Sequence, residues 1–423
     1  MTLVPKLRFP EFRGAEGWQE GKLITLSGDP LSNGVFNDPK KVGTGYKLIN
    51  VLDMYSDTTI DDGRLSLLEL SFSDFVGNQV VHGDIFFTRS SLVKSGIAVS
   101  NIYLGHSEDV TFDGHLIRLR PNTSKVVPLF AHYLFKTAPI RTQLIARGKS
   151  ATMTTIGQAD VASVILFYPA RDEQQKIADC LSSLDELIVA QARKVETLKT
   201  HKKGLMQQLF PREGETQPRL RFPEFWDAPD WTENNLGAIC KIQRGKFSHR
   251  PRNDPRFFGG QYPFIQTGDV VKSEGGSVRA SQSLNEDGLS VSKLFKPTIV
   301  LITIAANIGD TGILDREACF TDSVAGLIPN KGVSPFFLQL AVSDKKEYLN
   351  KIAPAAAQKN INNEILGVLP ISIPEFEEQQ RIADCLTSLD DLITAATQAL
   401  ETLKTHKKGL MQRLFPSAET VDA

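Results

Sequence analysis

The feature of this sequence that most limits its fold is a 39-residue stretch that occurs twice. It runs from Glu173 to Pro211 and returns 205 residues later, from Glu378 to Pro416, with 29 identical positions. Chance similarity does not persist over such a length, so the stretch is a duplicated structural unit.

Both copies have the apolar period of a helix that packs lengthwise on another helix. Apolar residues recur at alternating spacings of four and three, an average of 3.5 residues. We therefore predict a helix-pair seam lined by Ile177, Leu181, Leu184, Ile188, Val195, Leu198, Ile382, Leu386, Leu389, Ile393, Leu400 and Leu403. Gly204 and Gly409 are candidates for an early end of the regular helix in each copy.

The connectivity of the chain predicts that the two helices are antiparallel. A block of ordinary globular sequence precedes each helix, and the first helix must deliver the chain to the second block. The simplest arrangement is an antiparallel pair with one block at each end. A coiled coil that only connects domains is the plainer alternative.

Identity between the two copies extends to positions that the seam does not use. Packing alone does not require identical exposed residues, so a surface presented twice indicates a partner bound twice, although recent duplication also explains it. The candidate partner-binding residues are Lys199, His201, Lys203, Lys404, His406 and Lys408.

A second, shorter repeat extends the duplication to the whole chain. PKLRFPEF at 5–12 returns as PRLRFPEF at 218–225. We divide the chain into a first block (1–170), a first spacer helix (171–211), a second block (212–370) and a second spacer helix with a tail (371–423). If the last helix returns beside the N-terminus, Phe415-Pro416 faces Pro5 as Phe210-Pro211 faces Pro218. The order of elements is then pseudo-two-fold and circular.

Short β-rich runs separated by Gly, Asn and Asp predict that both blocks are α+β, with mixed or antiparallel sheets. Each block also contains a helix-like segment, at 127–146 and at 334–353. The fold class is therefore α+β, with two such domains separated by the helix pair.

Composition excludes several classes of protein. The formal net charge is −1, four cysteines in 423 residues form no disulfide framework, and no apolar run is long enough to cross a bilayer. The first residues lack the order of a secretion signal. We expect a cytoplasmic protein that has no membrane association and no structural zinc.

No motif in the chain supports catalysis. GKSAT at 148–152 lacks the glycine that a phosphate-binding loop requires five residues before the Gly-Lys pair. A methyltransferase would need a glycine-rich cofactor loop and an Asn/Asp-Pro-Pro-aromatic site, and neither occurs. The aspartates of GDIFFTR and NIGDTGILDRE could be imagined as nuclease metal ligands, but turn aspartates are the commoner explanation. We expect no catalytic residue and no metal site.

The charge pattern instead indicates a binding loop at 241–256. Six cations with one acid lie among Gly, Pro and Asn there, and such a loop suits phosphates and guanine edges. A solvated loop without function is the alternative. The candidate DNA-binding residues of this loop are Lys241, Arg244, Lys246, Arg250, Arg252 and Arg256. In the first block the weaker counterparts are Lys40, Lys41 and Lys47, with Arg89, Lys94, Arg141, Arg147 and Lys149 as possible extensions of that surface.

The chain as a whole resembles the specificity subunit of type I restriction–modification enzymes. The resemblance rests on RFPEF before each block, EQQKIADCL and EQQRIADCL at the helix entries, and the tails KKGLMQQLFP and KKGLMQRLFP. QKNINN at 358–363 also resembles the segment that ends such a block, whereas TTIGQAD at 154–160 departs from it.

The resemblance implies a non-catalytic subunit in which each block reads one half of a bipartite, asymmetric target in double-stranded DNA. It implies that the helix pair sets the gap and docks two copies of an adenine methyltransferase subunit. Motor and nuclease subunits would join them. S-adenosylmethionine, ATP and Mg²⁺ would be bound by those partners and not by this chain.

Three other classes of function stay open from the sequence. The chain could serve a different DNA-defence assembly as an orphan or repurposed recognition subunit. It could be a structural coiled-coil adaptor that binds only proteins. It could also be a nuclease in its own right, which would require metal-dependent cleavage by the isolated chain.

Overall fold

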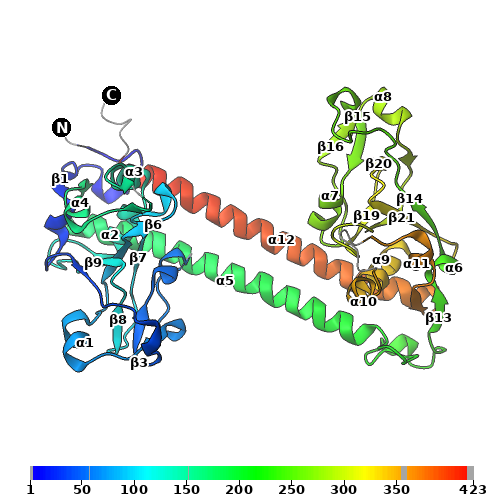
Figure 1. The fold of residues 1–423 in the computed structure, drawn as a ribbon, viewed down its shortest axis with the longest axis horizontal. Helices are drawn as coiled ribbons and strands as arrows, with labels where there is room; N and C mark the ends of the chain where they lie inside the picture. Colours follow the sequence, from blue (N-terminus) through cyan, green and yellow to red (C-terminus); the bar gives the residue numbers. More distant parts are fainter. Residues whose placement is uncertain (1–2, 57, 151, 354–359, 417–423) are drawn as a thin grey trace. The chain divides into compact units, whose positions relative to one another are not determined.

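A computed structural model describes residues 3–56, 58–150, 152–353 and 360–416. By its internal contacts the chain divides into two units, which we call unit 1 (Met1–Ala192 with Ala399–Ala423) and unit 2 (Arg193–Gln398). Each unit therefore contains one globular block and part of each long helix (Figure 1).

Unit 1 is built on short, mostly antiparallel sheets. The largest has the order β2-β9-β5-β7, and a second, β4-β3-β8, contains one parallel pair, β3 with β8. The strands of these two sheets are β2 (Ser32–Asn33), β9 (Leu116–Leu119), β5 (Ile85–Thr88), β7 (Ser100–Ile102), β4 (Ser66–Leu68), β3 (Val42–Ile49) and β8 (Val110–Phe112). The smaller sheets contain β1 (Gln19–Lys22), β12 (Ile165–Tyr168), β6 (Ser90–Ser91), β10 (Lys149–Ser150) and β11 (Thr154–Thr155).

Unit 2 repeats this plan. The sheet β14-β21-β18-β19 corresponds to β2-β9-β5-β7, and β16-β15-β20-β17 again contains one parallel pair, β15 with β20. The strands are β14 (Cys240–Arg244), β21 (Val324–Pro329), β18 (Ile299–Thr303), β19 (Thr311–Leu314), β16 (Gln282–Leu284), β15 (Phe258–Ile265), β20 (Ala318–Phe320), β17 (Leu294–Phe295), β13 (Thr232–Asn235) and β22 (Pro370–Ile373). The predicted α+β class with mixed sheets is confirmed.

The helix-like segment predicted at 127–146 is two helices, because Pro139 stands in the first turn of the second one. Proline has no N–H to donate and restricts the residue before it, so the first helix ends and a new one begins. The segment at 334–353 also divides, at Lys345. The helices are α2 (Pro128–Phe135), α3 (Ala138–Ala146), α9 (Pro335–Asp344) and α10 (Lys346–Ile352), with the shorter α1 (Phe72–Asn78), α4 (Gln158–Ala162), α6 (Leu236–Ile239), α7 (Thr267–Lys272), α8 (Glu286–Ser290) and α11 (Asn363–Gly367).

The two long repeats are single helices, α5 (Arg171–Leu209) and α12 (Phe376–Leu414). The expectation that Gly204 and Gly409 end them early is wrong, because both helices continue past the glycine for another turn. A glycine inside a helix costs about 1 kcal/mol relative to alanine. Apart from the adjoining residues and the nearby helix backbone, no atom in the described part of the chain lies within 4 Å of the Cβ position at either glycine, so packing inside the chain does not require them.

Ion pairs show that α5 and α12 run in opposite directions. In unit 1, Lys407 of α12 donates to Asp185 of α5. In unit 2, Lys202 of α5 lies 2.6 Å from Asp390 of α12. The interval from Asp185 to Lys202 equals the interval from Asp390 to Lys407, as an antiparallel register requires. The predicted antiparallel pair is confirmed.

The residues predicted to line the seam fall into two environments. In unit 1, Ile177 and Leu181 at the start of α5 lie in the domain core with Leu414 and Phe415 from the end of α12. In unit 2, the equivalent core holds Ile382, Leu386, Leu209 and Phe210. Leu184 and Val195 are buried between these ends. The remaining seam positions are partly buried, namely Ile188, Leu198, Leu389, Ile393, Leu400 and Leu403.

A buried ion pair joins each N-terminal RFPEF motif to the helix that follows its block. Arg8 lies 2.6 Å from Glu173 at the start of α5, with only 7% and 2% of the two side chains exposed. Arg8 also donates to the carbonyls of Ala15 and Glu16, at 2.8 Å each. Hydrogen bonding to Glu173 raises the pKa of the Arg8 guanidinium. Both charges therefore have partners, as buried charges require.

The same arrangement recurs in unit 2. Arg221 lies 2.7 Å from Glu378 at the start of α12, and both side chains are buried. Arg221 donates to the carbonyls of Ala228 and Pro229. The repeated arginine of RFPEF and the repeated glutamate that opens EQQ are thus explained by contacts inside each unit.

The helix ends complete each unit and make the order of elements circular. The N–H of Leu7 donates to the carbonyl of Arg413 near the end of α12, at 2.9 Å. The N–H of Leu220 donates equivalently to Gln208 near the end of α5, also at 2.9 Å. Phe415 packs edge-on against Trp18, with ring centroids 6.0 Å apart. The predicted return of the last helix to the N-terminal segment is confirmed.

No helix in the described ranges carries an apolar stretch of membrane-crossing length. Cys180, Cys240, Cys319 and Cys385 are free thiols.

We expect Glu173→Gln to destabilise unit 1 by about 3 kcal/mol, because it leaves the Arg8 guanidinium buried without its counter-charge. Urea unfolding monitored by hydrogen exchange would measure the loss and locate it in unit 1. Glu378→Gln should do the same in unit 2.

The matched control is Lys176→Gln. Lys176 lies on the same helix as Glu173, and the substitution removes its exposed ion pair with Glu11. It should leave the unfolding midpoint almost unchanged. If Glu173→Gln were as mild as this control, the buried pair would not be what joins the motif to the helix.

Candidate nucleic-acid interface

Both units contain the same Asn-Asp-Pro turn before a long strand. Asp38 accepts a hydrogen bond from the N–H of Lys40 at 3.0 Å, and Asp254 accepts one from the N–H of Arg256 at 3.1 Å. Each aspartate caps a single 3₁₀ turn, which leads into β3 in unit 1 and β15 in unit 2. The predicted cationic loop of the second block and its weaker counterpart are therefore equivalent places on one backbone plan.

The segment before this turn is also shared. Gly34 follows β2 and Gly245 follows β14, and each lies against a backbone carbonyl where a Cβ has no room, that of Phe112 or that of Thr321. Each glycine stands two residues before a phenylalanine, Phe36 or Phe247. Unit 2 then inserts five residues, 248–252 (SHRPR), before its Asn-Asp-Pro turn, whereas unit 1 goes directly to Asn37.

In unit 2, three of the predicted arginines converge on one acidic residue. Asp322 accepts hydrogen bonds from Arg250 at 3.0 Å and from Arg252 at 2.7 Å. The Nε of Arg244 donates to the backbone carbonyl of Asp322. Arg250 also donates to the carbonyls of Phe247 and His249. The inserted loop is thus held by an internal ion-pair network, while about half of the Arg250 and Arg252 side chains stay exposed.

The other predicted cations of unit 2 differ in their partners. Arg256 lies 3.4 Å from Asp254 and stacks over the ring of Phe257. Lys241 and Lys246 are exposed, and neither forms an ion pair with any residue that the structure describes. Their charges are therefore available to an anionic partner.

In unit 1, the predicted cations also divide into exposed and engaged groups. Lys40, Lys41, Arg89 and Lys94 have exposed side chains. Lys47 donates to the hydroxyl of Ser107 at 2.8 Å and lies 3.2 Å from Asp109.

Three predicted residues of unit 1 have contacts inside the unit. Arg147 donates to the hydroxyl of Ser163 and to the carbonyl of Gln143, both at 3.0 Å, and so joins the end of α3 to the end of α4. Arg141 donates to the carbonyl of Ser95 at 2.9 Å, and burial lowers its pKa. Lys149 lies 3.7 Å from Asp160.

Sequence reasoning missed three exposed apolar side chains in unit 1. Phe36, Leu52 and Leu92 are 78%, 82% and 83% exposed, whereas Phe247, the equivalent of Phe36, is buried. Alignment of the two Asn-Asp-Pro turns would have drawn attention to Phe36, because the basic insertion of unit 2 is missing beside it.

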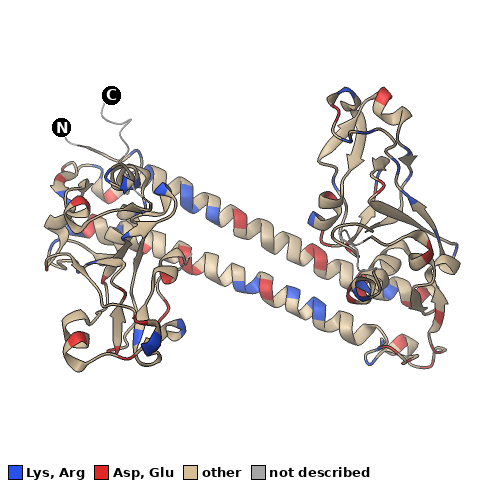
Figure 2. Cartoon of the chain, viewed as in Figure 1, with Lys and Arg blue, Asp and Glu red and all other residues tan. Residues whose placement is uncertain are grey.

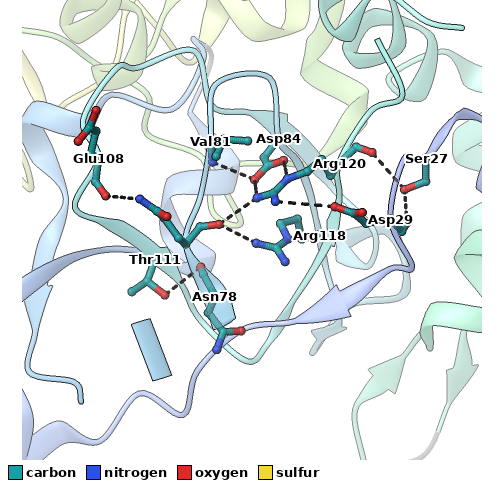
Figure 3. Close-up of polar contacts among 10 residues, drawn as sticks. Ser27, Asp29, Asn78, Val81, Asp84, Glu108, Thr111, Arg118 and Arg120 are labelled. Atoms are coloured by element: carbon teal, nitrogen blue, oxygen red, sulfur yellow. Dashed lines mark hydrogen bonds and ion pairs between the residues drawn. The ribbon is translucent and has the colours of Figure 1, made fainter. Parts of the chain in front are cut away.

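The aspartates that could be imagined as nuclease ligands are engaged with cations. Asp84 is fully buried and accepts two hydrogen bonds from Arg120, at 2.9 and 2.8 Å. Figure 3 shows this pair of residues. Hydrogen bonding to Asp84 raises the pKa of Arg120. Asp310 pairs with Lys346, and Asp315 pairs with Arg279. Within the described ranges, no group of three or more His, Cys, Asp or Glu side chains is placed to hold a metal ion.

The six predicted partner-binding residues of α5 and α12 all have exposed side chains, and Figure 2 shows cations and acids spread along both helices. Lys199 lies 3.7 Å from Glu274, and Lys404 lies 2.9 Å from Glu401. The lysines between them in the motif, Lys202 and Lys407, are the ones that pair across the helices.

Comparison with known proteins supplies a family and a set of relatives. The profile of the type I restriction modification DNA specificity domain matches residues 40–200 and 229–405. The chain is 28% identical over 408 residues to the putative type I restriction enzyme MjaX specificity subunit of Methanocaldococcus jannaschii, covering 95% of this chain and 93% of the relative. It is 27% identical to the HindI specificity subunit of Haemophilus influenzae, over 46% of this chain and 42% of the relative.

Two solved structures have a similar fold. One is the S subunit of a type I restriction-modification system from M. genitalium, with a TM-score of 0.62, 16% identity and coverage of 98% of this chain and 100% of that one. The other comes from work on complex assembly and conformational transition of the type I R-M system, with a TM-score of 0.57, 19% identity and coverage of 94% and 96%.

We expect Lys246→Ala to reduce the salt dependence of duplex DNA binding by about one phosphate contact, because that lysine is exposed and unpaired among the described residues. Arg147→Ala should lower the melting temperature of unit 1 and leave the salt dependence unchanged, since its hydrogen bonds lie inside the unit. Fluorescence anisotropy with a random duplex at several salt concentrations would measure the slope. Equal slopes for both variants would exclude Lys246 from the interface.

Proposed function

We propose that this chain, which belongs to the type I restriction–modification DNA specificity family, is a recognition subunit whose two domains each read one half of a bipartite, asymmetric DNA target. The resemblance found in the sequence is confirmed at the level of the family. The family is one of DNA specificity, and this agrees with a recognition role and not with a catalytic one.

The observation that carries the proposal is a shared turn that presents different chemistry in the two units. Unit 2 places Arg250 and Arg252 on a five-residue insertion, whereas unit 1 lacks the insertion and has the exposed Phe36 beside that point. The turn itself carries Lys40 and Lys41 in unit 1 and Arg256 and Phe257 in unit 2. Two surfaces on one backbone plan suit two unlike half-sites, because base readout depends on which side chains reach the groove.

The helix pair would set the gap between the half-sites. Each long helix begins on a buried ion pair of its own unit, and each ends against the N-terminal segment of the other unit's block. A length of paired helix between two reading domains fixes the number of unread base pairs.

The repeated exposed positions of α5 and α12 would dock two copies of an adenine methyltransferase subunit. Contacts inside the chain explain Lys202 and Lys407, but they do not explain the glycine that follows two residues later in each copy. A glycine without an internal reason allows close approach of a partner's backbone. Motor and nuclease subunits would join this assembly, and S-adenosylmethionine, ATP and Mg²⁺ would be bound by those partners in the cytoplasm.

The gap is tested by removing one heptad from each helix in register, residues 190–196 and the facing residues 396–402. At 1.5 Å per residue the pair shortens by about 10 Å, so the gap of the methylated target should shrink by about three base pairs. Methylome sequencing of cells that carry the matching methyltransferase gene measures the gap directly. An unchanged gap in the methylated target would refute the spacing role.

The docking role is tested by Gly204→Ala and Gly409→Ala. Each substitution should stabilise the isolated chain by about 1 kcal/mol, because alanine is the better helix former and has room for its Cβ. Each should also weaken capture of the methyltransferase subunit about tenfold, measured by titrating one purified subunit against the other.

The matched control is Thr394→Ala, which also favours the helix but lies at a position that is valine in the first copy. It should leave capture unchanged. Undiminished capture by both glycine variants would place the partner on another surface.

A further inference from the structure

Each unit has a turn between two strands that is contacted by a long loop, and the two turns occupy equivalent positions. In unit 1 the turn is Asp113–His115, between β8 and β9. In unit 2 it is Thr321–Ser323, between β20 and β21. The pairing of β5 with β9 and of β18 with β21 aligns Leu116 with Val324, which aligns Gly114 with Asp322.

In unit 2, three arginine side chains contact this turn. Asp322 holds Arg250 and Arg252 through its carboxylate, at 3.0 and 2.7 Å, and Arg244 through its backbone carbonyl. A guanidinium has five N–H donors, so Arg250 and Arg252 retain donors that neither Asp322 nor the carbonyls of Phe247 and His249 use. An arginine fixed in this way loses less conformational freedom when it binds the O6 and N7 acceptors of guanine.

In unit 1, backbone hydrogen bonds join the same turn to two segments that carry exposed apolar side chains. The N–H of Gly114 donates to the backbone carbonyl of Val35, the residue before Phe36, at 2.7 Å. The N–H of Arg89 donates to His115 at 2.8 Å, and Arg89 begins the connection from β5 to β7 that carries Leu92. That connection is four residues longer than its equivalent from β18 to β19. Phe36 and Leu92 are both largely exposed.

The charges around these apolar residues favour a nucleic-acid partner over a protein or a lipid. Arg89 and Lys94 flank Leu92, and Lys40 and Lys41 follow Phe36, all with exposed side chains. Exposed apolar side chains with cations near them in the chain match a groove in which thymine methyl groups lie between phosphates.

We infer that these two turns determine base choice: Arg250 and Arg252, positioned by Asp322, bind guanine in one half-site, and Phe36 and Leu92 contact thymine methyl groups in the other. The inference rests on the proposed function and adds the bases that each domain selects. Asp322 is a positioning residue, because it acts through the arginines and does not itself reach the DNA.

The test is selection of bound sequences from a random duplex pool by the full chain in complex with its methyltransferase subunit. The wild-type complex should select two half-sites, one with guanine and one with thymine at defined positions. Asp322→Asn should reduce the guanine preference roughly tenfold and leave the thymine half-site intact. The same substitution should leave the affinity for random DNA unchanged or raise it, because it removes a negative charge. A residue with a merely structural role would instead lower affinity for all sequences.

Phe36→Ser and Leu92→Ser should reduce the thymine preference several-fold and leave the guanine half-site intact. The matched controls are Phe72→Ser, an exposed aromatic residue on α1, and Asp315→Asn, a carboxylate in an exposed ion pair of unit 2. Neither control should change either half-site.

Three results would overturn the inference. One is a guanine preference that survives Asp322→Asn, and another is a thymine preference that survives both serine variants. The third is weaker methyltransferase capture by the serine variants while the complexes that still form select an unchanged target, since that would make Phe36 and Leu92 part of a protein interface. If the wild-type complex selected no sequence at all, the proposed function itself would fail, and this outcome differs from the other three.

Discussion

The buried pair of an arginine from RFPEF and the first glutamate of the long helix is the constraint on which each unit depends. In unit 1 it joins Arg8 to Glu173, and in unit 2 it joins Arg221 to Glu378. Separating two charges without water is costly, so the N-terminal segment and the start of the helix stay together once folded. The end of the other long helix packs against the same segment, through Leu7 and Arg413 or Leu220 and Gln208. Sequence positions far apart in the chain are thereby fixed as one core.

The two units share one backbone plan and differ in sequence where that backbone does not restrict the residue type or the loop length. Gly34 and Gly245 are required by the close approach of a carbonyl, and both Asn-Asp-Pro turns are capped by their aspartate. Between these fixed points unit 2 accepts an arginine-rich insertion that Asp322 neutralises in part, whereas unit 1 has an exposed phenylalanine. A net charge of −1 is compatible with DNA recognition because the relevant charges are local and placed on these loops.

The helix pair, its direction and the circular order could be predicted because their signals are periodic or duplicated. The ends of the helices could not be predicted. Gly204 and Gly409 remain helical against their intrinsic preference, because residues before and after each glycine are held by packing and ion pairs. The cationic loop was found from composition, yet composition could not separate Arg147, which joins α3 to α4, from Lys246, which has no ion-pair partner among the described residues. Phe36 and Asp322 were missed because local sequence predicts neither the exposure of a side chain nor its pairing with residues distant in the chain.

The sequence by itself determined that two alike helices pack together and that each follows an α+β block, because a heptad period and a long repeat each have few structural solutions. Only the tertiary structure decided which charges are free and which are held, and where apolar side chains face solvent. Those properties depend on residues that are distant in sequence, such as Arg252 and Asp322, meeting across a turn. A side chain's role in binding follows from its neighbours in space, and these are set only when the whole domain has folded.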